Sequence, residues 1–122
     1  MLFRSMLDLG EVAVMARVKL NGQDCGIAWK PPYRVDVSGA LKAGRNELEV
    51  TVVNQWANRL IGDGQLGDGW DAGRPKSWPK WLESGEARTG GQVTFTTGRH
   101  WQKDDELQPS GLLGPVTLQR AE

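Results

Sequence analysis

An alternating segment that ends in a tight-turn dipeptide limits the folds open to this chain. From Val12 to Leu20 apolar side chains recur at every second position, whereas Arg17 and Lys19 fall on the other face. A period of two is that of a strand with one buried face. The segment stops at Asn21-Gly22, a dipeptide that tolerates the positive φ angles of a two-residue hairpin turn. The sequence therefore predicts an antiparallel hairpin whose second strand runs through residues 26–30.

Further short strands are predicted along the chain. Pro31-Pro32 ends the hairpin, because proline cannot donate to a strand ladder. Alternation resumes in residues 33–37 and 48–52, and it returns in residues 92–97 and 114–119. About six or seven short strands without a long helix indicate an all-β fold, an antiparallel β-sandwich or jelly roll.

We predict one domain over residues 1–122, because a chain of this length buries one core but not two. The alternation is lost over residues 55–91 and 98–113, approximately, where we expect two long loops. Long loops in small domains are usually functional or disordered, and disordered segments are poor in aromatic residues. The first loop holds four of the six Trp, so it is a candidate binding region.

Composition excludes several classes of partner. Fifteen basic and fifteen acidic residues cancel and Lys and Arg form no cluster, so no nucleic-acid partner is expected. No apolar run approaches the roughly 18 residues of a membrane span, so no membrane partner is expected either. The single Cys25 cannot form an internal disulfide, and the glycines do not have the spacing of a phosphate-binding loop.

Two blocks of sequence resemble the sugar-binding domain of glycoside hydrolase family 2 and its relatives. The first block is ARVKLNGQDCGIAWKPPYRVDVSGALKAGRNELEVTVVNQWANRLIGD, and the second comprises TFTTGRHW and SGLLGPVTL. Together they look most like the C-terminal β-sandwich of bacterial α-L-rhamnosidase-type enzymes of family 106. The resemblance implies a galactose-binding-like β-sandwich from a glycoside hydrolase.

The resemblance also implies that the chain is a C-terminal fragment of a larger enzyme, whose catalytic domain lies elsewhere. Such domains have a strand before the one near Met6–Val12, so we expect the first strand to be missing and an unpaired sheet edge to be exposed there. Relatives tend to carry an aromatic residue where this chain has Gly98, which weakens any stacking role at that position. The start of the chain is a poor signal peptide, and we expect the parent protein to be exported by a bacterium.

Catalytic and metal chemistry have less support. Glycosidases need two carboxylates facing each other across a sugar, and the sequence fixes no such pair, so no catalytic residue is predicted. Asp63, Asp68 and Asp71 have the oxygens that Ca²⁺ prefers, but their spacing is not that of an EF-hand loop. We expect a solvated acidic loop, without a metal site or a cofactor.

Two groups of residues have the composition of a carbohydrate site, in which aromatic rings stack on sugars while amides, carboxylates and Arg bond the hydroxyls. The candidates are Trp56, Asn58, Arg59, Asp63, Trp78, Trp81, His100 and Trp101. The alternatives stay open: the Trp side chains plug the sandwich or dock on the parent enzyme, Arg59 pairs with Asp63, and His100 is a structural polar group or a general base.

The sequence therefore predicts a non-catalytic carbohydrate-binding or accessory module of an α-L-rhamnosidase-like glycoside hydrolase that acts in polysaccharide breakdown. Its expected partners are plant or microbial polysaccharide and the catalytic domain of the parent enzyme. The alternative is a purely structural domain, which packs on the catalytic domain and binds no sugar.

Overall fold

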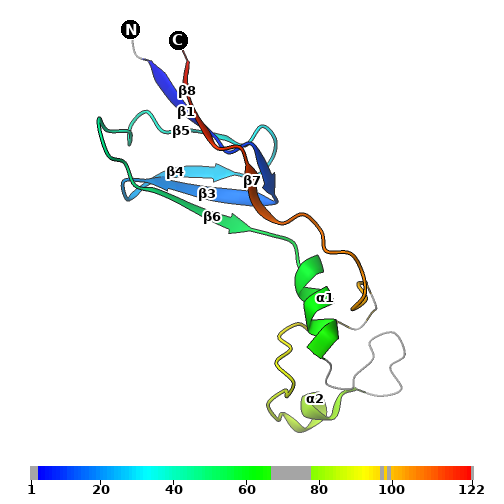
Figure 1. Cartoon of the computed structure of the whole chain (residues 1–122). Coiled ribbons are helices and arrows are strands. Elements are labelled where there is room, and N and C mark those ends of the chain that lie inside the picture. Colours follow the sequence, from blue (N-terminus) through cyan, green and yellow to red (C-terminus); the bar gives the residue numbers. More distant parts are fainter. Residues whose placement is uncertain (1–2, 67–77, 97, 99, 122) are drawn as a thin grey trace. The chain divides into compact units, whose positions relative to one another are not determined.

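The structure, a computed structural model, describes residues 3–66, 78–96, 98 and 100–121. The chain divides into two compact units (Figure 1), which we call the strand unit, Met1–Gln55 with Pro109–Glu122, and the helix unit, Trp56–Gln108. No helix in the described ranges is long and apolar enough to span a membrane. The prediction of a single domain stays a prediction.

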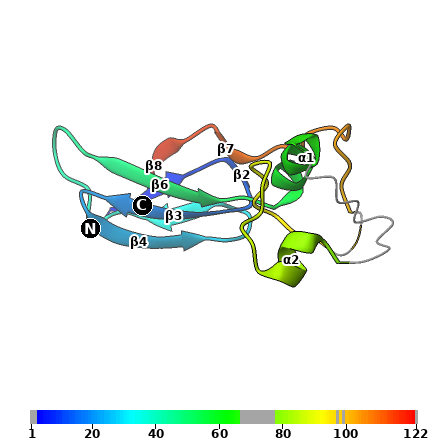
Figure 2. The same cartoon turned by 90° about the horizontal axis from the view of Figure 1, so that it is seen from below.

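The strands of the described chain all belong to the strand unit. They are β1 (Arg4–Asp8), β2 (Glu11–Ala13), β3 (Met15–Leu20), β4 (Gln23–Ala28), β5 (Arg34–Asp36), β6 (Leu48–Val53), β7 (Gly111–Gly114) and β8 (Thr117–Ala121). Within the described residues they form antiparallel sheets with the orders β5-β1-β8, β2-β7 and β4-β3-β6, and Figure 2 shows β4, β3 and β6 side by side. The predicted antiparallel all-β architecture is therefore confirmed for this unit.

The predicted hairpin is present as β3 and β4. Asn21 and Gly22 have φ angles of 53° and 79°, the positive values that a two-residue turn requires. The Asn21 side chain also donates hydrogen bonds to Ala40 O and Asn46 Oδ1, each at 2.8 Å. The turn is therefore fixed both by its own backbone preference and by contacts with a later loop.

The apolar core follows the predicted alternation. The segment from Val12 to Leu20 forms two strands, β2 and β3, instead of the one predicted, because the ladder is interrupted at Val14. Four of its five inward positions are nevertheless buried, and Val14 is half-buried. The core cluster consists of Leu7, Leu9, Val12, Ala16, Val18, Leu20, Ala28, Val35, Val37 and Ala40. Because these residues come from both three-stranded sheets, the two sheets face each other across the cluster.

Strand β1 lies in the middle of its sheet. Leu7 is paired with Val35 of β5 on one side and with Leu118 of β8 on the other. The prediction of an unpaired edge at Met6–Val12 is therefore wrong. Strand β8, from the opposite end of the sequence, supplies the second neighbour, and local alternation carries no information about so distant a partner.

Two glycines bring β2 and β7 into unusually close contact at one point. Gly10 has a φ of 66° and forms a bridge with Gly114. A Cβ added at Gly10 would lie 2.4 Å from the Gly114 carbonyl carbon and 2.6 Å from the Pro115 oxygen. Both the backbone conformation and the available space therefore require glycine at this position.

The prediction of a long loop over residues 55–91 is wrong for part of that range, because the helix unit has two helices there. It contains α1 (Ala57–Leu66) and α2 (Lys80–Ser84). Gly62 and Gly64 lie within α1 and lower its helix propensity, which masks the helix in the sequence. The helix is nevertheless supported by Ala57 and Ile61, which are buried one turn apart.

The chain leaves the strand unit after β6 and returns to it before β7. A hydrogen bond from Asn54 Nδ2 to Ser110 Oγ, 2.8 Å long, joins the outgoing and returning segments. Both residues belong to the strand unit. The strand unit therefore holds its two internal chain ends together through its own side chains.

Candidate functional site

Helix α1 places one acidic side chain in the interior. Asp63 is 4% exposed and is the buried charged residue of the described chain. A buried carboxylate is costly unless it is paired and hydrogen-bonded. One turn earlier on the helix, Arg59 Nε lies 3.0 Å from Asp63 Oδ1, so the predicted pairing of these two residues is confirmed.

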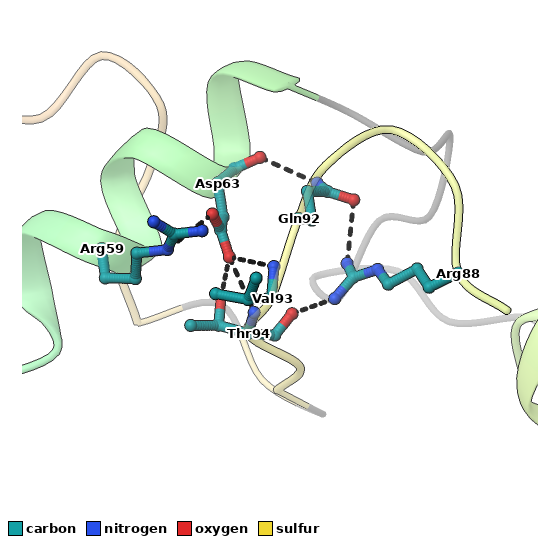
Figure 3. A network of polar contacts seen from close by, with 6 residues as sticks. All are labelled: Arg59, Asp63, Arg88, Gln92, Val93 and Thr94. Atoms are coloured by element: carbon teal, nitrogen blue, oxygen red, sulfur yellow. Dashed lines mark hydrogen bonds and ion pairs between the residues drawn. The ribbon is translucent and has the colours of Figure 1, made fainter.

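The other carboxylate oxygen of Asp63 fixes a distant segment of the helix unit (Figure 3). Asp63 Oδ2 accepts hydrogen bonds from Val93 N at 2.9 Å, and from Thr94 N and Thr94 Oγ1 at 2.7 Å. The backbone oxygen of Asp63 accepts a fourth bond, 2.8 Å long, from Gln92 Nε2. The prediction of a strand over residues 92–97 is wrong for the described residues, because these N–H groups bond a carboxylate instead of a neighbouring strand.

These contacts set the charge of Asp63. Burial removes water from the carboxylate and by itself raises its pKa. The hydrogen bonds from Thr94 and Val93, together with the charge of Arg59, outweigh burial and hold the pKa below its usual value. Asp63 is therefore ionised at neutral pH, and its oxygens act as acceptors.

Arg88 holds the same segment from another direction. Its Nη2 donates to Gln92 Oε1 at 2.9 Å, and its Nη1 donates to Thr94 O. The guanidinium lies over the Trp81 ring, 5.0 Å from the centroid, an arrangement in which the ring quadrupole attracts the cation. The segment is therefore held between Asp63 and Arg88, as Figure 3 shows.

Two of the Trp predicted to bind sugar belong to an aromatic cluster around Phe95. Trp81 packs edge to face on Phe95, with ring centroids 5.4 Å apart and an interplanar angle of 85°. Trp78 lies 6.4 Å from the same ring at 43°. Since these contacts engage both rings, the cluster favours a structural role for Trp78 and Trp81.

A cavity of about 330 Å³ lies beside this network, entirely within the helix unit. Its walls come from α1, from the segment held by Asp63 and Arg88, and from the segment that follows Gly98. Among the described residues, the lining consists of Leu60, Asp63, Gly64, Arg88, Gln92, Thr94, Phe95, Thr96, Gly98, His100, Trp101, Gln102, Lys103 and Asp104. The cavity therefore combines aromatic rings with polar and charged side chains.

Several polar side chains of the described lining remain available, among them three that can carry charge. The other charged groups and several uncharged ones already bond within the unit; they are Asp63, Arg88, Gln92, Thr94 and Thr96. Among the described residues, the side chains of His100, Lys103 and Asp104 have no hydrogen bond or ion pair. A ligand in the cavity would therefore meet an imidazole, an ammonium group and a carboxylate that are not yet engaged.

The structure brings together some of the predicted site residues and separates others. Asp63, His100 and Trp101 line the cavity, whereas the remaining five do not. Asn58 forms reciprocal bonds with the backbone of Gln108, at 2.8 and 2.7 Å, which is a structural role. Trp56 is 66% exposed and lies outside the lining.

Sequence reasoning missed several lining residues. Arg88, Gln92 and Phe95 lie outside any chemical motif, and only the fold brings them to α1. Lys103 and Asp104 could have been found from the sequence, because these two charged residues directly follow the His100-Trp101 pair and Gln102. Of the residues considered for Ca²⁺, Asp68 and Asp71 lie outside the described residues, and both oxygens of Asp63 are bonded to protein groups.

Comparisons with known proteins agree with this architecture. A family described as "Glycosyl hydrolase 2 galactose-binding domain-like" matches residues 3–108. A protein of Formosa agariphila named "Putative beta-glucuronidase" is 50% identical over 114 residues, which make up 92% of this chain and 10% of that protein. The solved structure of a rhamnosidase from Novosphingobium sp. PP1Y is similar with a TM-score of 0.72 and 37% identity, over 98% of this chain and 9% of that one.

Proposed function

Because the chain belongs to the family of galactose-binding-like domains of glycosyl hydrolase 2, we propose that it is a non-catalytic, carbohydrate-binding module. The chain spans 10% and 9% of the two relatives, whose names are those of glycoside hydrolases. The longer protein hydrolyses glycosides as a rhamnosidase or a glucuronidase does. The residues that catalyse this hydrolysis lie outside the module. The proposed ligand of the module is polysaccharide of plant or microbial origin.

The cavity of the helix unit is the observation that carries this proposal. Trp101 contributes aromatic surface, on which the apolar C–H face of a sugar packs. His100, Lys103 and Asp104 offer unengaged donors and acceptors for its hydroxyls. A cavity with apolar walls and a few convergent polar groups is the usual form of a small-molecule site.

The carboxylates of the cavity argue against catalysis in this module. Asp63 and Asp104 are the acidic residues among its described lining. A glycosidase needs one carboxyl group that donates a proton and a second that acts as base or nucleophile. Asp63 has a lowered pKa and both of its oxygens are bonded, so it supports the structure and is poorly suited to either task.

A purely structural role is the second candidate, and one surface of the strand unit favours it. On the outward face of the β4-β3-β6 sheet, Met15 is paired with Val53, and Ile27 lies on the adjacent strand. Their exposed fractions are 38%, 52% and 55%, and Trp29, just beyond β4, is 64% exposed. Exposed apolar side chains gathered on one face of a sheet commonly mark a contact with another domain.

Titration of the 122-residue chain with carbohydrate tests the leading proposal. Tryptophan fluorescence and calorimetry would be followed on addition of rhamnose, galactose, glucuronic acid and pectic oligosaccharides. We expect saturable binding and a fluorescence change, because Trp101 lines the cavity. A chain that is folded by circular dichroism yet binds none of these compounds would overturn the proposal in favour of the structural role.

A further inference from the structure

We propose that two copies of this chain associate edge to edge through the strand unit. In the proposed dimer, the two β8 strands pair antiparallel across a two-fold axis, and the two β6 strands meet in the facing sheet. The inference goes beyond the proposed function and does not depend on carbohydrate binding. It rests on two free strand edges and on the exposed core residues beside them.

Strands β6 and β8 are each the outermost strand of a three-stranded sheet. In the described chain β8 pairs with β1 and β6 pairs with β3, so the other edge of each strand has no partner strand there. Such an edge presents a row of N–H and C=O groups that can pair with another chain. Figure 2 shows β8 on the β6 side of the strand unit, away from β4. The two free edges therefore lie on the same side of the sandwich.

The described chain leaves the core partly uncovered on this side. Residues directly opposite each other on antiparallel strands point to the same face of a sheet. Leu118 lies opposite Leu7, yet Leu118 is 55% exposed whereas Leu7 is 7% exposed. In the facing sheet Leu48 lies opposite Leu20, and their exposed fractions are 42% and 5%. Each outermost strand therefore extends the apolar core into a region that this chain does not cover.

The opposite side of the sandwich has features that prevent such pairing. Natural edge strands avoid association by shortness, by proline, by charge or by a bulge. Strand β5 has three residues, closely follows Pro31-Pro32 and carries Arg34 and Asp36. Strand β4 has an irregular register with β3. By contrast, β8 and β6 have five and six residues in regular register and contain neither proline nor lysine.

A second copy fits this side better than one added strand. A single strand would pair with one of the two edges and leave the other unpaired. A two-fold axis perpendicular to the sheets presents the same two edges at the same separation, with antiparallel strands in both sheets. Two-fold dimers are also the commonest symmetric oligomers of soluble proteins. Each three-stranded sheet would then continue into its counterpart in the second copy.

The side chains of β8 favour a register centred on Leu118. In this register Leu118 lies opposite the partner's Leu118, and Arg120 lies opposite the partner's Val116. The two Arg120 side chains are then about 13 Å apart along the strands, which exceeds the Debye length of about 8 Å at physiological salt. The guanidinium of Arg120 already lies over the Phe3 ring, 5.2 Å from its centroid. The register therefore joins apolar side chains and keeps like charges apart.

Sedimentation velocity and light scattering of the full 122-residue chain test the inference. The chain would be measured over about two orders of magnitude of micromolar concentration at neutral pH. We expect a reversible equilibrium in which the mass rises from 13.4 kDa toward twice that value. Amide hydrogen exchange should slow in β6 and β8 of the concentrated chain, and it should stay unchanged in β4 and β5.

Three variants locate the interface. Leu118→Lys and Leu48→Lys act on different sheets, and each should raise the Kd of the dimer by about tenfold or more, because charge on an edge strand opposes pairing. Ile27→Lys is the matched control, because Ile27 is also 55% exposed but lies on β4. Its Kd should stay unchanged, and circular dichroism would verify that every variant is folded.

Three results would overturn the inference. A folded chain that stays monomeric at every concentration would leave an added strand of a longer protein as the occupant of this side. A dimer that survives both Leu118→Lys and Leu48→Lys would use another surface. Association weakened by Ile27→Lys alone would place the contact on the outward face of the β4-β3-β6 sheet.

Discussion

An Asp63→Ala variant should lose about 3–5 kcal/mol of unfolding free energy in the helix unit, the scale seen when one partner of a buried ionic group is removed. The substitution leaves Val93 N, Thr94 N and Thr94 Oγ1 without their acceptor. Urea unfolding monitored by Trp fluorescence would measure the loss, because every Trp except Trp29 belongs to the helix unit.

Arg59→Ala is the matched control for this experiment. Arg59 contacts the same carboxylate, but its side chain is 52% exposed, and exposed ion pairs contribute about 0–1 kcal/mol. We therefore expect a much smaller loss than in Asp63→Ala. Equal losses in the two variants would show that the ion pair, and not the bonds to Val93 and Thr94, dominates the stability of the unit.

The lowered pKa of Asp63 gives the helix unit a characteristic acid response. A carboxyl group whose pKa is lower in the folded than in the unfolded chain contributes stability above its unfolded pKa of about 4. That contribution declines as the pH falls through the folded pKa. Fluorescence-monitored unfolding between pH 7 and pH 2 should show this decline, and Asp63→Asn should reduce it. If Asp63→Asn lost as much stability at low pH as the unchanged chain, the decline would not come from Asp63.

Gly10→Ala should destabilise the strand unit by about 2–5 kcal/mol, the sum of a strained positive φ and a steric overlap. The new Cβ would lie 2.4 Å from the Gly114 carbonyl carbon, and backbone atoms cannot rotate away as a side chain can. Separation of β2 from β7 would relieve the overlap. Urea unfolding followed by far-ultraviolet circular dichroism, together with exchange of the β2 and β7 amide hydrogens, would measure the effect.

Gly44→Ala separates the two contributions at Gly10. Gly44 has a comparable φ of 80°, but no atom lies within 4 Å of its hypothetical Cβ. Its substitution should cost only the backbone strain, about 1–2 kcal/mol. If both variants lost the same free energy of unfolding, the close approach of Gly10 to Gly114 would contribute nothing to the loss.

The strand unit was largely predictable because its signals are local. Alternation identified the buried face of β2 and β3, and Asn21-Gly22 identified the turn between β3 and β4. The position of β1 was not predictable, because β8 joins it from the other end of the chain. Pairing between distant segments depends on the whole fold, and alternation within one segment does not encode it.

The helix unit was less predictable because its organising group is a single side chain. The alternation around Val93 and Phe95 resembles a strand, yet the N–H groups of Val93 and Thr94 bond to Asp63. The richness in Trp suggested a binding region, but Trp78 and Trp81 pack on Phe95 and only part of the predicted set lines the cavity. Composition locates such a region, whereas the division between packing and exposed surface requires coordinates.

The bond between Asn54 and Ser110 has a consequence for how this module can change. Because the strand unit closes its own sequence gap, the helix unit is an insertion whose ends are already fixed close together. Loops anchored in this way tolerate replacement of their contents, since closure adds little entropic cost. Under the proposed function, a different insertion between β6 and β7 would give the same strand unit a different ligand site, so that specificity could change by exchange of this one segment while the sheets stay the same.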